Sequence, residues 1–313
     1  MDRPGIIVIM GPTAAGKSAV GMIVAGRLGA GIISADSRQV YRGMNIGTAK
    51  PGAADRARVP HHLIDVLTPD QPFSAGSFRE MTLAAIEDIQ KRGKRALVVG
   101  GTSLYLKALV GGYRLSDMPP DPEFRGEMRA REAERPGFLY RRLAEVNPVL
   151  AARLSPRDFP RLIRALEVAR APNGTPTRHS VRGDESASNP ETRVFALLGS
   201  RDWVYDRINR RVNEMFTAGL VEEVRALLAK YPPDAPAFTT PGYREIIAYL
   251  HQSPVGDRRA VPASLEEVKE LIKRNTRRFA KHQFTWLKQF DYTPVDIETL
   301  GVEGAAEFIV NRL

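Results

Sequence analysis

Residues 11–18, GPTAAGKS, form a glycine-rich loop that ends in lysine and serine. Glycines at the two ends of such a loop let backbone N–H groups converge on phosphate oxygens, and a following helix dipole strengthens the binding. Lys17 supplies a positive charge, and the Ser18 hydroxyl can ligate Mg²⁺. The motif is shared with ATP-binding and other nucleotide-binding proteins; it predicts a diphosphate site without specifying the reaction. The predicted loop residues are Gly11, Pro12, Thr13, Ala14, Ala15, Gly16, Lys17 and Ser18.

Two further polar residues follow apolar, strand-like runs. Asp36 ends the run that begins at Ile32, and Thr102 follows residues 95–101. We expect parallel strands, with Asp36 on a strand beside the phosphate loop, so that these groups meet at one edge of the sheet. The carboxylate of Asp36 could ligate Mg²⁺ or act as a base, and the Thr102 hydroxyl could face a bound anion. The Gly100-Gly101 ending, in place of a strand-terminal Asp, argues mildly against ATP hydrolysis.

The polar stretch after Asp36 suits contact with a nucleotide. Arg and Gln side chains read base edges or hold phosphates, and Arg38 and Gln39 follow directly in a loop. A turn cap by Asp36 or Ser37 would by itself explain the Asp-Ser pair. The neighbouring Arg38 and Gln39 favour a binding role.

Basic residues cluster on two segments with helical patterns. In residues 202–217, Arg207 and Arg211 lie one turn apart on the flank of an apolar stripe, where they could clamp a diphosphate or form a solvated basic face. Residues 273–290 carry a basic stripe that suits a nucleic acid backbone. Its cationic residues are Lys273, Arg274, Arg277, Arg278, Lys281 and His282. Aromatic residues interleave with them, and for Phe279, Phe284 and Trp286 we expect core positions in preference to base-stacking platforms.

The composition indicates a basic protein of ordinary globular type. The 313 residues carry 46 Lys and Arg against 36 Asp and Glu, which gives a net charge of +10. This surplus favours a polyanionic partner, with nucleic acid as the first candidate, over a merely solvated basic surface. The absence of cysteine excludes disulfides, thiolate zinc sites and thiol nucleophiles. No signal peptide or apolar run of membrane-spanning length stands out, so we expect a cytoplasmic protein.

Strand-like and helical patterns alternate through the first hundred residues and predict an α/β fold. We expect a parallel sheet core of the P-loop NTPase type, flanked by helices, with an all-helical insertion domain. The core comprises residues 1–116 and 193–313, and the Pro- and Arg-rich residues 117–192 form the insertion. The expected core strands are 6–10, 32–36, 61–66, 95–101 and 193–199, and the main expected helices are 18–28, 77–93, 202–229, 242–250, 264–289 and 303–312.

Nine sequence blocks, in order between residues 11 and 288, resemble the tRNA dimethylallyltransferase family. They are GPTAAGKS, ISADSRQVYRGMNIGTAKP, PHHLIDV, FSAGSFR, VVGGTSLYLKAL, DPEFR, PRLIRALEV, GYREI and RRFAKHQFTWLK. The blocks cover nearly the whole chain, which makes the resemblance specific. The sequence has no cysteine-bearing zinc module of the eukaryotic members, so it resembles the bacterial type.

The resemblance implies transfer of a dimethylallyl group from dimethylallyl diphosphate to N6 of adenosine 37, next to the tRNA anticodon, with release of pyrophosphate. The loop would hold the diphosphate with Mg²⁺ on Ser18, and Asp36 would be the base at N6. Thr102, Arg211 and, second, Arg207 would neutralise the leaving pyrophosphate. The adenine must leave the stacked anticodon loop to reach these groups.

The resemblance also implies which residues contact tRNA. They are Asp36, Ser37, Arg38, Gln39, Arg125, Pro160, Arg161, Leu162, Ile163, Arg164, Gly242, Tyr243, Arg244, Arg278 and Lys281. Among them, Gln39 would read neighbouring nucleotides. His282 stands where the family usually has Arg, so the family's phosphate contact at this position is not carried over to it. We expect a monomer that binds tRNA and dimethylallyl diphosphate and no membrane.

Three other functions fit parts of the pattern. A P-loop kinase for a small molecule or nucleotide would use residues 117–192 as an Arg-rich lid over ATP, and phosphoryl transfer from ATP would identify it. A non-catalytic RNA-binding protein would use the loop to grip phosphate, but it leaves Asp36 without a role. An enzyme that prenylates free adenine nucleotides shares the chemistry, but the insertion and the basic helix favour tRNA.

Overall fold

The computed structural model describes residues 5–110, 120–170, 192–253 and 261–313. The chain divides into two compact units, one formed by Met1–Gly111 with Ser188–Leu313 and the other by Gly112–Ala187. The predicted boundary after residue 116 lies outside the described residues, and the predicted boundary after residue 192 follows directly on an undescribed stretch.

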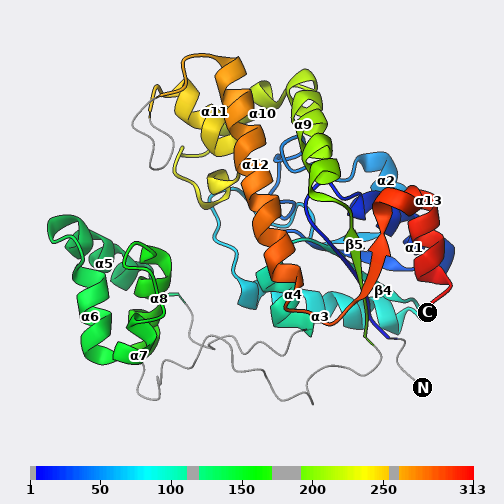
Figure 1. The fold of residues 1–313 in the computed structure, drawn as a ribbon, viewed down its shortest axis with the longest axis horizontal. Helices are drawn as coiled ribbons and strands as arrows, with labels where there is room; N and C mark the ends of the chain where they lie inside the picture. Colours follow the sequence, from blue (N-terminus) through cyan, green and yellow to red (C-terminus); the bar gives the residue numbers. More distant parts are fainter. Residues whose placement is uncertain (1–4, 111–119, 171–191, 254–260) are drawn as a thin grey trace. The chain divides into compact units, whose positions relative to one another are not determined.

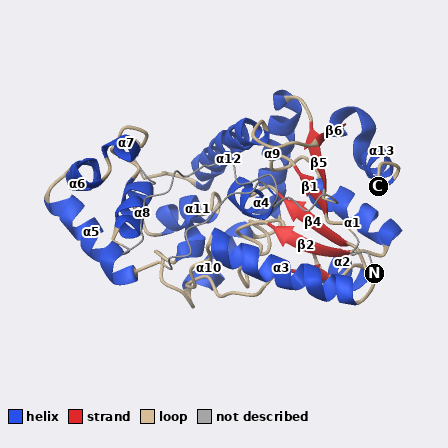
Figure 2. Ribbon diagram, turned by 90° about the horizontal axis from the view of Figure 1, so that it is seen from below, coloured by secondary structure: helices blue, strands red, loops and turns tan. Residues whose placement is uncertain are grey.

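A six-stranded sheet forms the centre of the first unit. Its strands are β1 (Ile7–Met10), β2 (Gly31–Ala35), β3 (His61–His62), β4 (Ala96–Gly100), β5 (Arg193–Leu198) and β6 (Thr293–Asp296). Their order is β3-β2-β4-β1-β5-β6, and every neighbouring pair is parallel. Figure 2 shows the strands running side by side in one direction. The predicted parallel α/β fold is confirmed.

Three details of the sheet differ from the prediction. The strand expected at 61–66 comprises only His61–His62. The strand that leads to Asp36 does not lie beside β1, because β4 pairs with both β1 and β2 and separates them. Sequence order does not determine strand order when a crossover skips a position. The edge strand β6 was not predicted, since four residues that include Pro294 carry almost no strand signal.

One face of the sheet packs against α1 (Lys17–Leu28) and α13 (Ile297–Val310), as Figure 1 shows. Alternate strand residues point into this layer, because successive side chains of a strand face opposite ways. The strand residues involved are Ile7, Ile9, Ile32, Leu97, Val99, Phe195, Leu197 and Val295. Helix α3 (Ala75–Lys91), which connects β3 to β4, packs closely on β2. Gly31 of β2 allows this contact, because a Cβ atom at this position would lie only 2.9 Å from Ile89 Cδ1.

A second apolar cluster joins the helices that follow β5. These helices are α9 (Arg201–Thr217), α10 (Leu220–Leu228), the 3₁₀ turn η2 (Pro236–Thr239), α11 (Tyr243–Leu250) and α12 (Leu265–Leu287). Figure 1 shows α12 running beside α9 and ending near α4 (Ser103–Val110). The long segment between β2 and β3, with α2 (Ala53–Arg58), also packs here through Val40, Tyr41 and Met44. This cluster covers the carboxyl ends of the strands, where function was expected.

The second unit is helical throughout its described residues. It contains α5 (Pro122–Glu134), α6 (Phe138–Val146), α7 (Pro148–Ala151) and α8 (Phe159–Ala169). Three of these helices begin at an Asp or Asn whose side chain accepts a backbone N–H of the first turn, which stabilises the helix start. Leu139, Leu143 and Leu162 are fully buried in a core of its own. Nowhere in the described ranges does either unit contain a helix with the length and apolarity to cross a membrane.

Candidate active site

A cavity of about 580 Å³ lies within the first unit, at the carboxyl ends of β1, β2 and β4. The glycine-rich loop, Asp36, Thr102, Arg207 and Arg211 all line it. These residues come from four separate stretches of the chain. The structure thus brings together all the residues for which a catalytic role was predicted, and the roles themselves stay predictions.

The glycine-rich loop turns sharply between β1 and α1. Gly16 takes a left-handed conformation at φ 91° directly before the helix, where a residue with a side chain would be strained. The Lys17 ammonium reaches back over the loop and donates a hydrogen bond to the Pro12 carbonyl at 2.7 Å. Burial lowers the pKa of Lys17 to about 8; the charge of Asp36 opposes this shift and that of Arg211 adds to it. An ammonium held in this way is available to a bound anion.

Both arginines of α9 point toward the cavity rather than forming a solvated face. Arg207 donates from Nε to the Ala14 carbonyl at 2.7 Å, and Arg211 donates from Nη2 to the Thr48 carbonyl at 3.3 Å. Burial lowers the pKa of both groups. Arg207 therefore supports the glycine-rich loop through Ala14, and Arg211 contacts the cavity wall that contains Thr48. The structure therefore argues against a solvated basic face, and the diphosphate clamp stays a prediction.

Asp36 and Thr102 are linked through one turn. The Thr102 hydroxyl accepts the backbone N–H of Ser37 at 3.0 Å, and Asp36 Oδ1 accepts the N–H of Arg38 at 2.8 Å. The capping role considered for Asp36 is thus real. Because the carboxylate also lines the cavity, capping and a role as base are compatible.

Gln39 lies with its side chain turned inward. It is 8 % exposed, and its Oε1 accepts the Ser34 hydroxyl at 2.9 Å. Its Nε2 donates to the carbonyls of Thr48 (3.3 Å) and Ala49 (3.4 Å). These bonds tie the end of β2 to the 45–49 loop, so reading a nucleotide with this amide would require exchanging them.

Gln283 is a cavity residue to which the sequence reasoning assigned no role. Its Oε1 accepts the Thr13 N–H at 2.7 Å, and its Nε2 donates to the Gly101 carbonyl at 2.8 Å. One buried amide from α12 thereby clips together the loops after β1 and β4. The sequence did contain a signal for this role. Gln283 shares a buried helical stripe with Ala280 and Leu287, and a polar side chain in such a stripe needs hydrogen-bond partners.

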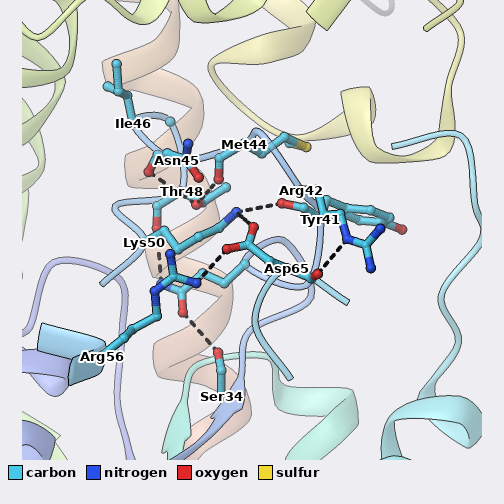
Figure 3. Close-up of polar contacts among 12 residues, drawn as sticks. Ser34, Tyr41, Arg42, Met44, Asn45, Ile46, Thr48, Lys50, Arg56 and Asp65 are labelled. Atoms are coloured by element: carbon cyan, nitrogen blue, oxygen red, sulfur yellow. Dashed lines mark hydrogen bonds and ion pairs between the residues drawn. The ribbon is translucent and has the colours of Figure 1, made fainter. Parts of the chain in front are cut away.

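The segment between β2 and β3 has its own ionic cluster, shown in Figure 3. Lys50 is nearly fully buried, with its ammonium 2.6 Å from Asp65 Oδ1 and 2.6 Å from the Tyr41 carbonyl. Arg56, from α2, approaches the other oxygen of Asp65 at 2.7 Å. This pairing ties the segment between β2 and β3 to Asp65, which lies just after β3.

The predicted tRNA residues of α11 and its start are mostly engaged within the fold. The Gly242 N–H donates to Glu245 at 2.7 Å, and Arg244 pairs with the same carboxyl group at 2.8 Å. Tyr243 is fully buried, and its hydroxyl donates to Glu223.

Along α12, by contrast, Arg278, Lys281 and His282 are exposed. The core expectation for Phe279 is wrong: it is 46 % exposed and lines the cavity. The reason lies in helical spacing, because Phe279 stands one turn before Gln283 on the side that faces the cavity. Phe284 does pack against the core, as expected.

The predicted tRNA residues of the second unit divide into core and surface positions. Leu162 and Ile163 are buried, while Pro160 and Arg161 are exposed. The remaining two, Arg125 and Arg164, both contact the carboxylate of Glu167, which is 2 % exposed.

No group of three or more His, Cys, Asp or Glu in the described part of the chain is arranged to hold a metal ion. The predicted Mg²⁺ ligand Ser18 and the carboxylate of Asp36 do line the cavity, together with the carboxylate of Glu214 and further hydroxyl groups. Mg²⁺ usually takes few protein ligands and completes its shell with substrate phosphates and water. This donor set fits a Mg²⁺ ion that arrives with a diphosphate.

A parallel α/β sheet with a glycine-rich loop, a carboxylate and two arginines around one cavity defines a class of protein that binds a phosphorylated substrate. Residues 39–290 match the family model described as IPP transferase. The chain belongs to this family, as predicted from its sequence blocks.

Individual relatives agree with this assignment. The chain is 48 % identical to tRNA dimethylallyltransferase 1 of Citrifermentans bemidjiense, over 90 % of this chain and 88 % of that protein. It is 42 % identical to the tRNA dimethylallyltransferase of Pelotomaculum thermopropionicum, over 96 % and 92 %. Its structure resembles that of the tRNA delta(2)-isopentenylpyrophosphate transferase of Staphylococcus epidermidis, with a TM-score of 0.71 at 30 % identity over 99 % of this chain and 98 % of that one.

Proposed function

We propose that this protein is a tRNA dimethylallyltransferase that modifies adenosine 37, next to the anticodon. The observation that carries the proposal is the single cavity in which a carboxylate faces a loop and two arginines suited to a diphosphate. The names of the relatives support both the tRNA substrate and the prenyl group.

The chemistry needs help at both ends of the reacting bond. The N6 amine of adenine is a weak nucleophile because its lone pair is delocalised into the ring. As N6 attacks C1 of dimethylallyl diphosphate, the C1–O bond breaks, pyrophosphate leaves, and Asp36 takes the proton from N6. Lys17, Arg207, Arg211 and the Thr102 hydroxyl stabilise the negative charge that builds on the leaving oxygen.

Mg²⁺ is part of this proposal. Ser18 would hold the ion together with oxygens of the diphosphate, where it would supply further charge neutralisation. The glycine-rich loop then serves as a site for a prenyl diphosphate, and binding of ATP is not required. The proposal also includes a cytoplasmic location and a monomeric state, for which the support is the sequence alone.

Binding of tRNA is proposed to use exposed cations of α12 and of the helical unit. Arg278 and Lys281 are free to contact phosphates from the core, and Arg161 offers a cation from the second unit. The net charge of +10 agrees with such a partner.

A transfer assay tests the function. Purified protein is incubated with Mg²⁺, radiolabelled dimethylallyl diphosphate and unmodified tRNA, without ATP. We expect label to enter the tRNA. Absence of label, with ATP consumed in a parallel reaction, would instead support the kinase alternative.

A further inference from the structure

The carboxylate of Glu223, in α10, holds the loop that forms one wall of the cavity. Its Oε2 atom accepts the N–H groups of Asn45 at 2.9 Å and Ile46 at 2.8 Å. Its Oε1 atom accepts the N–H of Gly47 at 3.2 Å and the hydroxyl of Tyr243 at 2.6 Å. Hydrogen bonds to a charged acceptor are stronger than neutral ones, so four of them on one carboxylate make a firm anchor.

Tyr243 gives this anchor a rigid floor. It is fully buried, and a Cβ at Gly47 would lie only 2.5 Å from its ring. Burial and the charge of Glu223 raise the pKa of Tyr243, so the phenol keeps the proton that it donates. The 45–47 loop therefore packs directly against a buried ring, and the carboxylate of Glu223 bonds to both.

The residue that follows this loop connects it to the catalytic arginine. The carbonyl of Thr48 accepts from Arg211 Nη2 at 3.3 Å and from Gln39 Nε2 at 3.3 Å. Its hydroxyl donates to the Met44 carbonyl at 2.7 Å, which closes the loop on itself; Figure 3 shows this contact. Because Thr48 is one residue beyond Gly47, the placement of its carbonyl depends on the three N–H groups that Glu223 holds.

We propose that Glu223 is a positioning residue for Arg211. It fixes the 45–47 backbone, this backbone places the Thr48 carbonyl, and the carbonyl orients the guanidinium that neutralises the leaving pyrophosphate. The inference rests on the prenyl transfer proposed above. In Glu223→Gln, an NH₂ group replaces one acceptor oxygen and meets backbone donors, so the loop must shift. A displacement of about 1 Å in a group that stabilises the transition state costs about 100-fold in rate.

A double-mutant cycle with Arg211→Ala tests this role. We expect Glu223→Gln to lower kcat for prenyl transfer about 100-fold, with a much smaller change in KM for tRNA. In the Arg211→Ala background the same change should lower kcat by less than about threefold, because its target is already gone. Glu222→Gln is the matched control, since Glu222 is the exposed neighbour of Glu223 on α10 and carries the same charge. Equal losses in both backgrounds, or an equal loss from Glu222→Gln, would overturn the positioning role.

A second readout separates this inference from the proposed function. Affinity for inorganic pyrophosphate, measured by calorimetry in the same proteins, requires no transfer reaction. If the wild-type protein transfers no prenyl group but its pyrophosphate affinities are non-additive across the cycle, the function fails and the coupling of Glu223 to Arg211 stands. Additive affinities in an active enzyme would overturn the coupling alone. Should Glu223→Gln fail to fold by circular dichroism, Glu223→Asp, which keeps the charge but withdraws the carboxylate by one methylene, takes its place under the same criteria.

Discussion

The charge of Lys17 should make diphosphate binding depend on pH in the weakly alkaline range. Burial in the glycine-rich loop lowers the pKa of Lys17 from 10.5 to about 8; Asp36 opposes the shift and Arg211 adds to it. A bound diphosphate favours the ammonium and so raises this pKa again. Affinity is therefore highest below pH 8 and falls as the pH rises through 8, because the free protein loses the proton that the complex retains.

The size of the effect follows from the two pKa values. If the diphosphate restores the pKa of Lys17 to its ordinary value, the apparent Kd rises about tenfold between pH 7 and pH 9. Calorimetric titration with inorganic pyrophosphate at several pH values measures it. The control is Lys17→Arg, which stays charged over this range and therefore reports the ionisation of pyrophosphate and of other groups. The same pH dependence in both proteins would refute Lys17 as the group that titrates near pH 8.

Three other substitutions have defined outcomes. Asp36→Asn should lower kcat for prenyl transfer by about 10²–10⁴ with pyrophosphate affinity nearly unchanged, and an unaltered kcat would contradict the role as base. Gln283→Leu removes both hydrogen bonds of a buried amide and should lower the free energy of unfolding, measured with urea, by about 2 kcal/mol. An unchanged free energy would show that the hydrogen bonds between Gln283 and the two loops do not stabilise the fold. Glu167→Gln removes the buried anion that two arginines share and should destabilise the helical unit by about 3 kcal/mol. Burial favours a raised pKa for Glu167, but hydrogen bonds from these arginines outweigh it and lower the pKa to about 2, so the carboxylate's stabilisation is complete above pH 4.5 and is lost as the pH falls toward 2. A Glu167→Gln unfolding transition equal to that of the wild type would contradict this.

The main features of the fold were predictable because they depend on local signals. Four apolar runs with buried strand composition became β1, β2, β4 and β5, and all but the second are followed by a helical pattern or a glycine turn. Several helix boundaries agreed within a few residues for the same reason, since α3, for example, was expected at 77–93 and spans Ala75–Lys91. The single helix expected at 202–229 was wrong, because Gly219, at φ 93°, separates α9 from α10. The strand β6 carried too short a signal to be found, although it completes the sheet beside β5.

The candidate site was predictable in its parts but not in its connections. The glycine-rich loop, Asp36 and Thr102 each follow a strand, so a parallel sheet had to bring them to one edge. The bonds between distant segments had no such signal. Glu223 reaches a loop some 176 to 178 residues away in the chain, and Gln283 joins Thr13 across a separation of 270 residues. Only the folded packing of α10 and α12 creates these contacts.

The central claim is that the cavity transfers a prenyl group to one adenosine beside the anticodon. The most direct test is mass spectrometry of the anticodon fragment after incubation of unmodified tRNA with the protein, Mg²⁺ and dimethylallyl diphosphate. We predict a mass increase of one dimethylallyl group on adenosine 37 and loss of the product with Asp36→Asn. The claim would be contradicted if folded wild-type protein left the anticodon fragment unmodified, or if the prenyl group were found on a different nucleotide.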